Sequence, residues 1–124
     1  MKHYDLNNIE GDHVNPAYKR SVVSGEALTV ARIEVREGEV TQSHSHDSEE
    51  MIYVISGRWL FHLPDGDVEV GPNQMLSIPA DAVHSSEVLE DTVALDICSK
   101  HRADWLSGQD RPLHSNPEHF LWAV

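Results

Sequence analysis

Residues 38–57 read GEVTQSHSHDSEEMIYVISG, and they place two histidines and a carboxylate close together in the chain. His44 and His46 are two residues apart, so on a strand both imidazoles would share one face. Glu50 follows four positions later, and His84 lies on a separate predicted strand that a barrel could bring alongside. Three imidazole nitrogens and a carboxylate oxygen suit Fe, Mn, Ni, Cu or Zn better than calcium or magnesium. On His44 and His46 alone, an exposed pair that binds metal adventitiously is the alternative.

The rest of the chain reads as short strands separated by turn residues, with almost no helical period. Strands are expected at residues 21–23, 27–35, 41–46, 50–56, 58–63, 68–70, 74–78, 84–88 and 93–98. Pro64-Asp65-Gly66-Asp67 is a strong turn signal, because Pro and Gly supply the required φ values. One or two helical turns are expected within residues 99–106. Many short strands at even spacing predict an all-β sandwich or barrel.

Charge and composition exclude several classes of partner. The 124 residues hold 9 Lys plus Arg against 21 Asp plus Glu, a formal charge of -12. This charge disfavours binding to nucleic acid or to an anionic membrane. The single cysteine, Cys98, cannot form an internal disulfide. With no signal peptide and no apolar stretch near the roughly 20 residues of a membrane span, we expect a cytoplasmic protein.

The length predicts one domain over residues 1–124. We expect a barrel core at about 21–98, an N-terminal arm at 1–20, and a C-terminal lid or tail at 99–124. The apolar residues 120–124 are expected to pack on the barrel or on a partner subunit.

Five residues at fixed spacing carry a family resemblance. The pattern G-x5-H-x-H-x3-E-x6-G is formed by Gly38, His44, His46, Glu50 and Gly57. It resembles the first motif of the cupin superfamily at every fixed position. The resemblance implies an RmlC-like jelly-roll β-barrel in a single-domain cupin.

The second cupin motif, G-x5-P-x-G-x2-H-x3-N, is matched in part. Pro79 and His84 stand at the right separation, and Asn73 replaces the first glycine. Asn is the next-best residue for a left-handed turn. Asp81 replaces the second glycine, and Val88 replaces the terminal asparagine.

The resemblance also implies the metal ligands, which are His44, His46, Glu50 and His84. They would hold one divalent Fe, Mn, Ni or Zn ion. Four protein ligands on an octahedral ion leave two positions open, which favours a catalytic or substrate-binding metal. A structural zinc, usually closed by four ligands and often by thiolates, is the alternative.

The last predicted strand carries a carboxylate, Asp96, among apolar residues. Burying an unpaired carboxylate is costly, so Asp96 needs a partner, a metal-bound water or a wet pocket. The alternative is that Asp96 faces solvent, or pairs with an arginine such as Arg32 or Arg58.

The stretch 96–105 resembles the end of the KdgF-type cupins, which linearise uronates and typically read D-x-F-x-x-x-R-x-D. Asp96 and Arg102 match this pattern, whereas Cys98 stands in place of the phenylalanine. The resemblance implies two catalytic residues, with Asp96 shuttling a proton and Arg102 holding a substrate carboxylate.

Two further residues, Tyr53 and His62, either line the interior or pack elsewhere. The remaining histidines are expected at the solvated surface; they are His3, His13, His101, His114 and His119.

These observations predict a metal-dependent enzyme that acts on a small polar or anionic molecule. A lyase or isomerase of sugar acids, such as unsaturated uronates, is the favoured activity. The alternatives are an Fe(II)-dependent dioxygenase with a small chelating substrate, and a non-catalytic cupin that binds metal or sugar. By analogy with small cupins, we expect a homodimer.

Overall fold

The computed structural model describes residues 1–100 and 102–114. Its elements are β1 (Asp12–Asn15), β2 (Tyr18–Ser24), β3 (Leu28–Val35), β4 (Val40–His44), β5 (Glu50–Leu63), β6 (Gly66–Val70), β7 (Met75–Ile78), β8 (His84–Ser99), the helix α1 (Ala103–Ser107) and the 3-10 turn η1 (Arg111–Leu113). All pairings between these strands are antiparallel. The predicted all-β class, with a short helical turn near the C-terminus, is confirmed.

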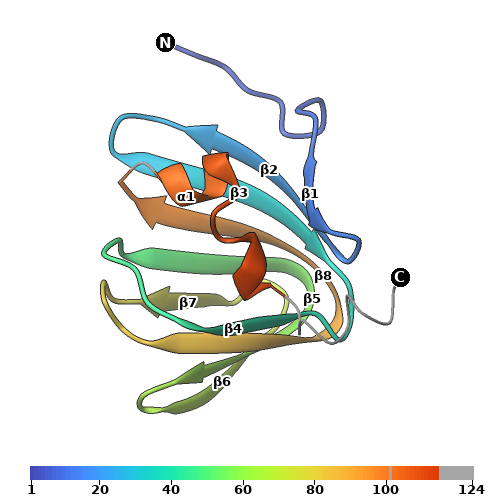
Figure 1. Cartoon of the computed structure of the whole chain (residues 1–124). Coiled ribbons are helices and arrows are strands. Elements are labelled where there is room, and N and C mark those ends of the chain that lie inside the picture. The colour runs from blue at the N-terminus through green and yellow to red at the C-terminus, as the bar shows by residue number, and fades with distance from the viewer. Residues whose placement is uncertain (101, 115–124) are drawn as a thin grey trace.

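Two long strands, β5 and β8, pair with each other and run through both layers of the fold (Figure 1). The first half of β8 pairs with β4, and its second half pairs with β3. In the same way, the start of β5 pairs with β7, and its end pairs with β6. One layer therefore holds β1, β2, β3 and β7, the other holds β4 and β6, and β5 and β8 contribute to each.

The bend between the layers is centred on Gly57. The β5–β8 register shifts on both sides of this residue, which has φ +97. A Cβ at this position would overlap the Asp91 carbonyl oxygen and the Thr92 backbone, so only glycine fits. The sequence predicted separate strands on each side of Gly57, and again around residues 89–92. This prediction was wrong, because the glycine lets the strand bend without ending.

The core is formed by alternate residues that face inward from neighbouring strands. On β3 these are Ala31, Ile33 and Val35, and on β5 they include Ile52 and Val54, all almost fully buried. Burying an Ile or Val side chain stabilises the fold by about 1.5–3 kcal/mol relative to exposure. The same inward rows continue into polar residues at one end of the barrel, and this end contains the candidate site.

The sheet starts earlier than the sequence indicated. Residues 1–20 were predicted as an arm, but β1 pairs with β2, and Tyr18 and Arg20 are buried. A buried arginine breaks the apolar pattern by which a strand is recognised. Its partner, Asp110, lies 90 residues away, so the sequence gives no local sign of the pairing.

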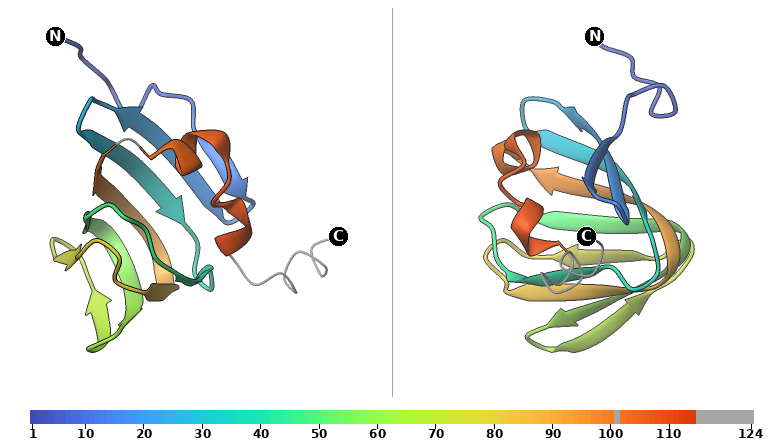
Figure 2. Two further views of the ribbon diagram at one scale, coloured as in Figure 1. Left: turned by 60° about the vertical axis from the view of Figure 1, so that its left-hand side comes forward. Right: turned by 45° about the vertical axis from the view of Figure 1, so that its right-hand side comes forward.

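The C-terminal segment, defined here as residues 102–114, runs from β2 toward β4 across the open side between the layers (Figure 2). Arg20 on β2 holds Asp110, and Thr41 on β4 forms a bridge with His114. Gly108 ends α1 in a left-handed conformation with φ +79. The turn η1 was not predicted, and the predicted packing of residues 120–124 lies outside the described residues. In the part of the chain that the structure describes, no helix is long and apolar enough to cross a membrane.

Candidate metal centre

Three of the four predicted ligands come from strands that meet at one end of the barrel, and the fourth comes from the loop between two of them. His44 ends β4 and is the register partner of His84, which starts β8. Glu50 starts β5, opposite Cys98 near the end of β8. His46 lies in the loop between β4 and β5, two residues beyond His44. Strand pairing therefore brings together residues that are up to 40 positions apart in the sequence.

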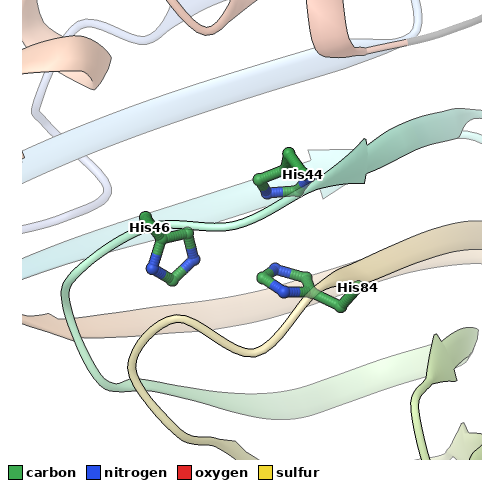
Figure 3. A group of neighbouring side chains, drawn as sticks. All are labelled: His44, His46 and His84. Carbon is green, nitrogen blue, oxygen red and sulfur yellow. The ribbon is translucent and has the colours of Figure 1, made fainter.

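The three imidazole rings surround a common space (Figure 3). The ring centroids are 4.4 Å apart for His44 and His84, 5.1 Å for His46 and His84, and 5.8 Å for His44 and His46. One ring nitrogen from each lies within 4.8 Å of the others. This spacing allows a single ion to be held by all three.

Backbone carbonyls fix the tautomer of each ring. The Nδ1 partners are the carbonyl oxygens of Gln42 for His44 at 2.8 Å, of Ser48 for His46 at 2.9 Å, and of Ala82 for His84 at 2.9 Å. A carbonyl oxygen only accepts, so each Nδ1 donates its proton. Nε2 is therefore the available ligand atom of each ring, as in histidines that bind metal.

Glu50 supplies the negative charge of the group. Its Oε1 is 3.3 Å from Nε2 of His46 and 3.3 Å from Nε2 of His84. Burial acts to raise the pKa of Glu50, but His46, His84 and Asp96 hold this pKa well below its usual value. Burial also acts to lower the pKa of His84, but Glu50 outweighs it and raises this pKa. The opposite shifts of these two pKa values show that Glu50 and His84 stabilise each other's charged forms, in the position where a cation would act on Glu50.

These residues fit a divalent transition metal. Nε2 of His46 is buried and has no hydrogen-bond partner among the described residues, because its approach to Glu50 lacks hydrogen-bond geometry. Leaving such a group unpaired costs about 1–3 kcal/mol. An ion bound at this nitrogen would remove that cost. The set of three imidazoles and one carboxylate is typical of Fe, Mn, Ni or Zn.

Asp96 lies beside this group, on the inward face of β8. It is 5% exposed, and one ligand atom each from Glu50, Asp96 and Cys98 lies within 4.8 Å of the others. Burial and then the charge of Glu50 raise the pKa of Asp96 well above its usual value. The two carboxyl groups are therefore coupled, with Glu50 favoured as the charged form and Asp96 as the neutral form.

The alternative partners of Asp96 are engaged elsewhere. Arg32 pairs with Glu34 at 3.5 Å, and Arg58 pairs with Glu69 on the exposed surface. Asp96 thus faces the interior without either arginine.

Cys98 and Arg102 form the next layer around Asp96. Cys98 Sγ is 3.8 Å from Oε2 of Glu50 and 3.8 Å from Oδ1 of Asp96, and it accepts a hydrogen bond from Arg102 Nη1 at 3.3 Å. Burial raises the pKa of Cys98, so it remains a thiol. Arg102 places its Nε and Nη2 on the Asp104 carboxylate at 2.8 and 2.7 Å. The planar fork of Arg102 is therefore already occupied, which the sequence did not indicate.

A cavity of about 40 Å³ adjoins these residues. Its walls include ligand residues from β4, β5 and β8, and aromatic side chains from β5. The C-terminal segment closes one side with Arg102, Trp105, Asp110, Leu113 and His114.

Tyr53 and His62, which the sequence allowed either to line the interior or to pack elsewhere, face outward. The Tyr53 hydroxyl donates to Asn73 Oδ1 at 2.6 Å, and His62 is exposed beside Asp67 and Glu87. Neither residue is among those that line the cavity. Asn73 has φ +62, as expected of a residue that replaces a glycine in a left-handed turn.

One histidine predicted at the surface is buried. His114 is 7% exposed, and its Nε2 lies 2.7 Å from Asp110 Oδ2. Its Nδ1 lies 2.9 Å from the Thr41 hydroxyl. Arg20 completes this group by donating to both Asp110 oxygens, at 2.6 and 3.0 Å. Sequence analysis missed the group; the only signal was a histidine four residues after an aspartate.

Solved structures share this fold. KdgF from a Halomonas species is 21% identical, with a TM-score of 0.77 over 84% of this chain and 99% of that chain. An RmlC-like cupin from Shewanella frigidimarina is 17% identical, with a TM-score of 0.77 over 85% and 96%. Oxalate decarboxylase from Bacillus subtilis, which has Mn(II) centres, is 18% identical, with a TM-score of 0.68 over 84% of this chain and 33% of that chain. The predicted jelly-roll fold is confirmed.

No sequence among curated proteins matches the chain. Residues 31–98, more than half of the chain, match the protein family described as "Cupin domain". This range contains the three histidines and Glu50 as well as Asp96. The chain therefore belongs to the cupin family.

Proposed function

We propose that the protein is a metal-dependent enzyme that moves a proton on a small, oxygen-rich anion, as a lyase or isomerase. One observation carries the proposal: the buried carboxyl of Asp96 lines the same cavity as the ligand residues His44, Glu50 and His84. Proton-transfer enzymes need such a group within reach of the reacting atom.

His44, His46, His84 and Glu50 would hold the ion. When bound, a divalent ion supplies Lewis-acid stabilisation to negative charge that develops on a substrate oxygen. The chain itself orients these ligands through the carbonyls that fix each Nδ1. Removing such an outer hydrogen bond typically lowers metal affinity or activity by about 10- to 100-fold, which corresponds to about 1–3 kcal/mol.

Asp96, whose raised pKa favours the protonated carboxyl, would give its proton to the substrate and take one back at the same oxygen. The Cys98 thiol and the guanidinium of Arg102 hold this side of the cavity in place. Arg102 keeps only the N–H groups that Asp104 and Cys98 do not use. We therefore propose that Arg102 contributes a positive charge to the cavity wall. The sequence had implied instead that Arg102 binds a substrate carboxylate through two hydrogen bonds.

The substrate would be an anion, because the ion and Arg102 form a local positive centre in a chain of formal charge -12. Sugar acids, including unsaturated uronates, are one class with this chemistry, and the similarity in fold to KdgF supports their inclusion in a screen. Smaller oxyacids are a second class.

The test is turnover by protein loaded with Mn, Ni, Zn or Fe(II), with and without oxygen. We expect turnover under anaerobic conditions, and we expect Asp96→Asn to abolish it while metal is retained. The matched control is Asp47→Asn, which alters an exposed carboxylate. Turnover that consumes oxygen and requires Fe(II) would instead establish the dioxygenase. Tight ligand binding without any reaction would establish a binding protein.

Three other expectations stay proposals. They are a single functional domain, a homodimer and a cytoplasmic location. Light scattering on the purified protein tests the homodimer directly, since a monomer would have half the expected mass.

A further inference from the structure

The cavity beside the metal ligands is small. Its volume is about 40 Å³. In the same measure, one water molecule needs about 10–15 Å³, so the cavity holds roughly three or four groups of that size. A six-carbon uronate has several times as many non-hydrogen atoms.

The wall that limits this volume is firmly fixed. Leu113 and His114 close the cavity, and Asp110 anchors them to Arg20 through a pair that is only 1–2% exposed. His114 is also tied to Thr41 on β4. Enlarging the cavity from this side would expose the buried Arg20–Asp110 pair and break its contacts with His114 and the Trp105 carbonyl, so the small volume belongs to the stable fold.

Two hydrogen-bond donors in the cavity wall have no acceptor within residues 1–100 and 102–114. Trp59 is 4% exposed, and its Nε1 is buried without a partner among the described residues. Tyr18 is 3% exposed and lines the same cavity, and no hydrogen bond of its hydroxyl is found within the described part of the chain. Burial raises the pKa of Tyr18, which keeps its hydroxyl protonated as a donor. Buried donors of this kind are normally satisfied, by protein, water or a ligand.

The Tyr18 ring is held in position by its neighbours. The ring of His114 lies 4.6 Å from it, centroid to centroid, and the Arg20 guanidinium lies 5.9 Å from its centroid. A positioned donor can select a ligand that offers an acceptor and reject one that does not.

We propose that the substrate is a compact chelating oxyacid, of about the size of a two- or three-carbon carboxylic acid, and that Tyr18 and Trp59 donate hydrogen bonds to its oxygen atoms. The proposal rests on the proposed function, since it concerns the same site. It narrows the substrate class from oxygen-rich anions in general to those that fit this small cavity. Tyr18 and Trp59 then determine specificity from the cavity wall.

The experiment is a calorimetric titration of the full chain loaded with Mn(II), with oxalate, malonate, succinate and galacturonate as probes. We expect oxalate to bind at least about tenfold more tightly than succinate or galacturonate, because the longer acids do not fit. We expect Tyr18→Phe to weaken oxalate binding by about three- to tenfold, the usual range for one lost hydrogen bond. Trp59→Phe should have an effect of the same order.

The controls separate the two proposals. Tyr53→Phe removes an outward hydroxyl and should leave oxalate binding unchanged, and the Mn(II) affinity should be the same in all three variants. Galacturonate binding as tight as oxalate binding would overturn the size limit. Equal oxalate affinity in Tyr18→Phe, Trp59→Phe and the wild type would overturn the donor assignment, and the proposed function would still stand. Failure of the wild type to bind Mn(II) would overturn the proposed function, and the inference with it.

Discussion

Two polar groups lie in the walls of one cavity, and they differ in how their charges are balanced. The metal-ligand group gathers three imidazoles around Glu50 and leaves a buried nitrogen of His46 without a hydrogen-bond partner among the residues that the structure describes. The second group, Arg20 with Asp110 and His114, pairs a full positive charge with a full negative charge through two short hydrogen bonds. The first group is completed only by a cation, whereas the second is complete in itself. The first is therefore suited to binding, and the second to holding the C-terminal segment in place.

The largest effect is expected from breaking the second group. Asp110→Asn should lower the free energy of unfolding by about 3–5 kcal/mol, because it leaves the buried charge of Arg20 uncompensated. Chemical denaturation followed by circular dichroism measures this loss. The matched control is Asp47→Asn, which breaks an exposed pair with Lys100 and should cost less than about 1 kcal/mol. Equal effects of the two variants would show that the Arg20 pair contributes no more than a surface pair.

Substitutions in the first group should lower the metal affinity more than they lower the stability of the apoprotein. His84→Ala removes one of the ligand nitrogens and should weaken Mn(II) binding by more than about 100-fold, or roughly 2.7 kcal/mol. Competition with a chromophoric chelator measures the affinity. His62→Ala removes an exposed histidine and should leave the affinity unchanged. A similar loss in both variants would contradict the assignment of the ligands.

Acid should lower the free energy of unfolding that the second group contributes, but by less than the Asp110→Asn substitution does. Burial acts against ionisation of Asp110, but His114 and Arg20 hold its pKa well below the usual value. A depressed pKa contributes stability that is fully present above about pH 4 and is lost as pH falls further, toward the pKa of the folded state. Denaturation at a series of pH values should therefore show a smaller loss in acid for Asp110→Asn than for the wild type. Parallel pH profiles would contradict the ion pair.

The smallest effect is expected at the contact between the second group and β4. Thr41→Val keeps the shape of the side chain but removes the hydroxyl beside His114, and it should cost about 0.5–1.5 kcal/mol. Thermal unfolding measures the change. Thr41→Ser keeps the hydroxyl and should restore part of the stability if the hydrogen bond is responsible. A valine variant more stable than the serine variant would show that packing outweighs the hydrogen bond.

The comparison also explains which parts could be predicted from the sequence. The positions of His44, His46 and Glu50 follow from spacing along the end of β4, the next loop and the start of β5, and pairing of β4 with β8 adds His84. Local alternation and fixed intervals are visible in a sequence. The left-handed turn at Asn73 was also predictable, because few residues tolerate that conformation.

The second group could not be predicted, because its members depend on contacts between distant segments. Arg20 and Asp110 are 90 residues apart, and each alone reads as a charged surface residue. His114 was expected at the surface for the same reason. The engagement of Arg102 with Asp104 was missed although only one residue separates them, since spacing alone does not show which way a side chain turns. Strand periodicity reports burial of apolar rows and says little about paired charges within them.

The placement of β8 in the sheet determines how late in synthesis the barrel can fold. This strand lies between β3 and β5 and also carries β4, so three earlier strands depend on it for pairing. During synthesis from the N-terminus, β3, β4 and β5 are made before residues 84–99. Their edges remain open until β8 arrives, and open edges favour association with other chains. We therefore expect the barrel to form late, in a single step that waits for its central strand.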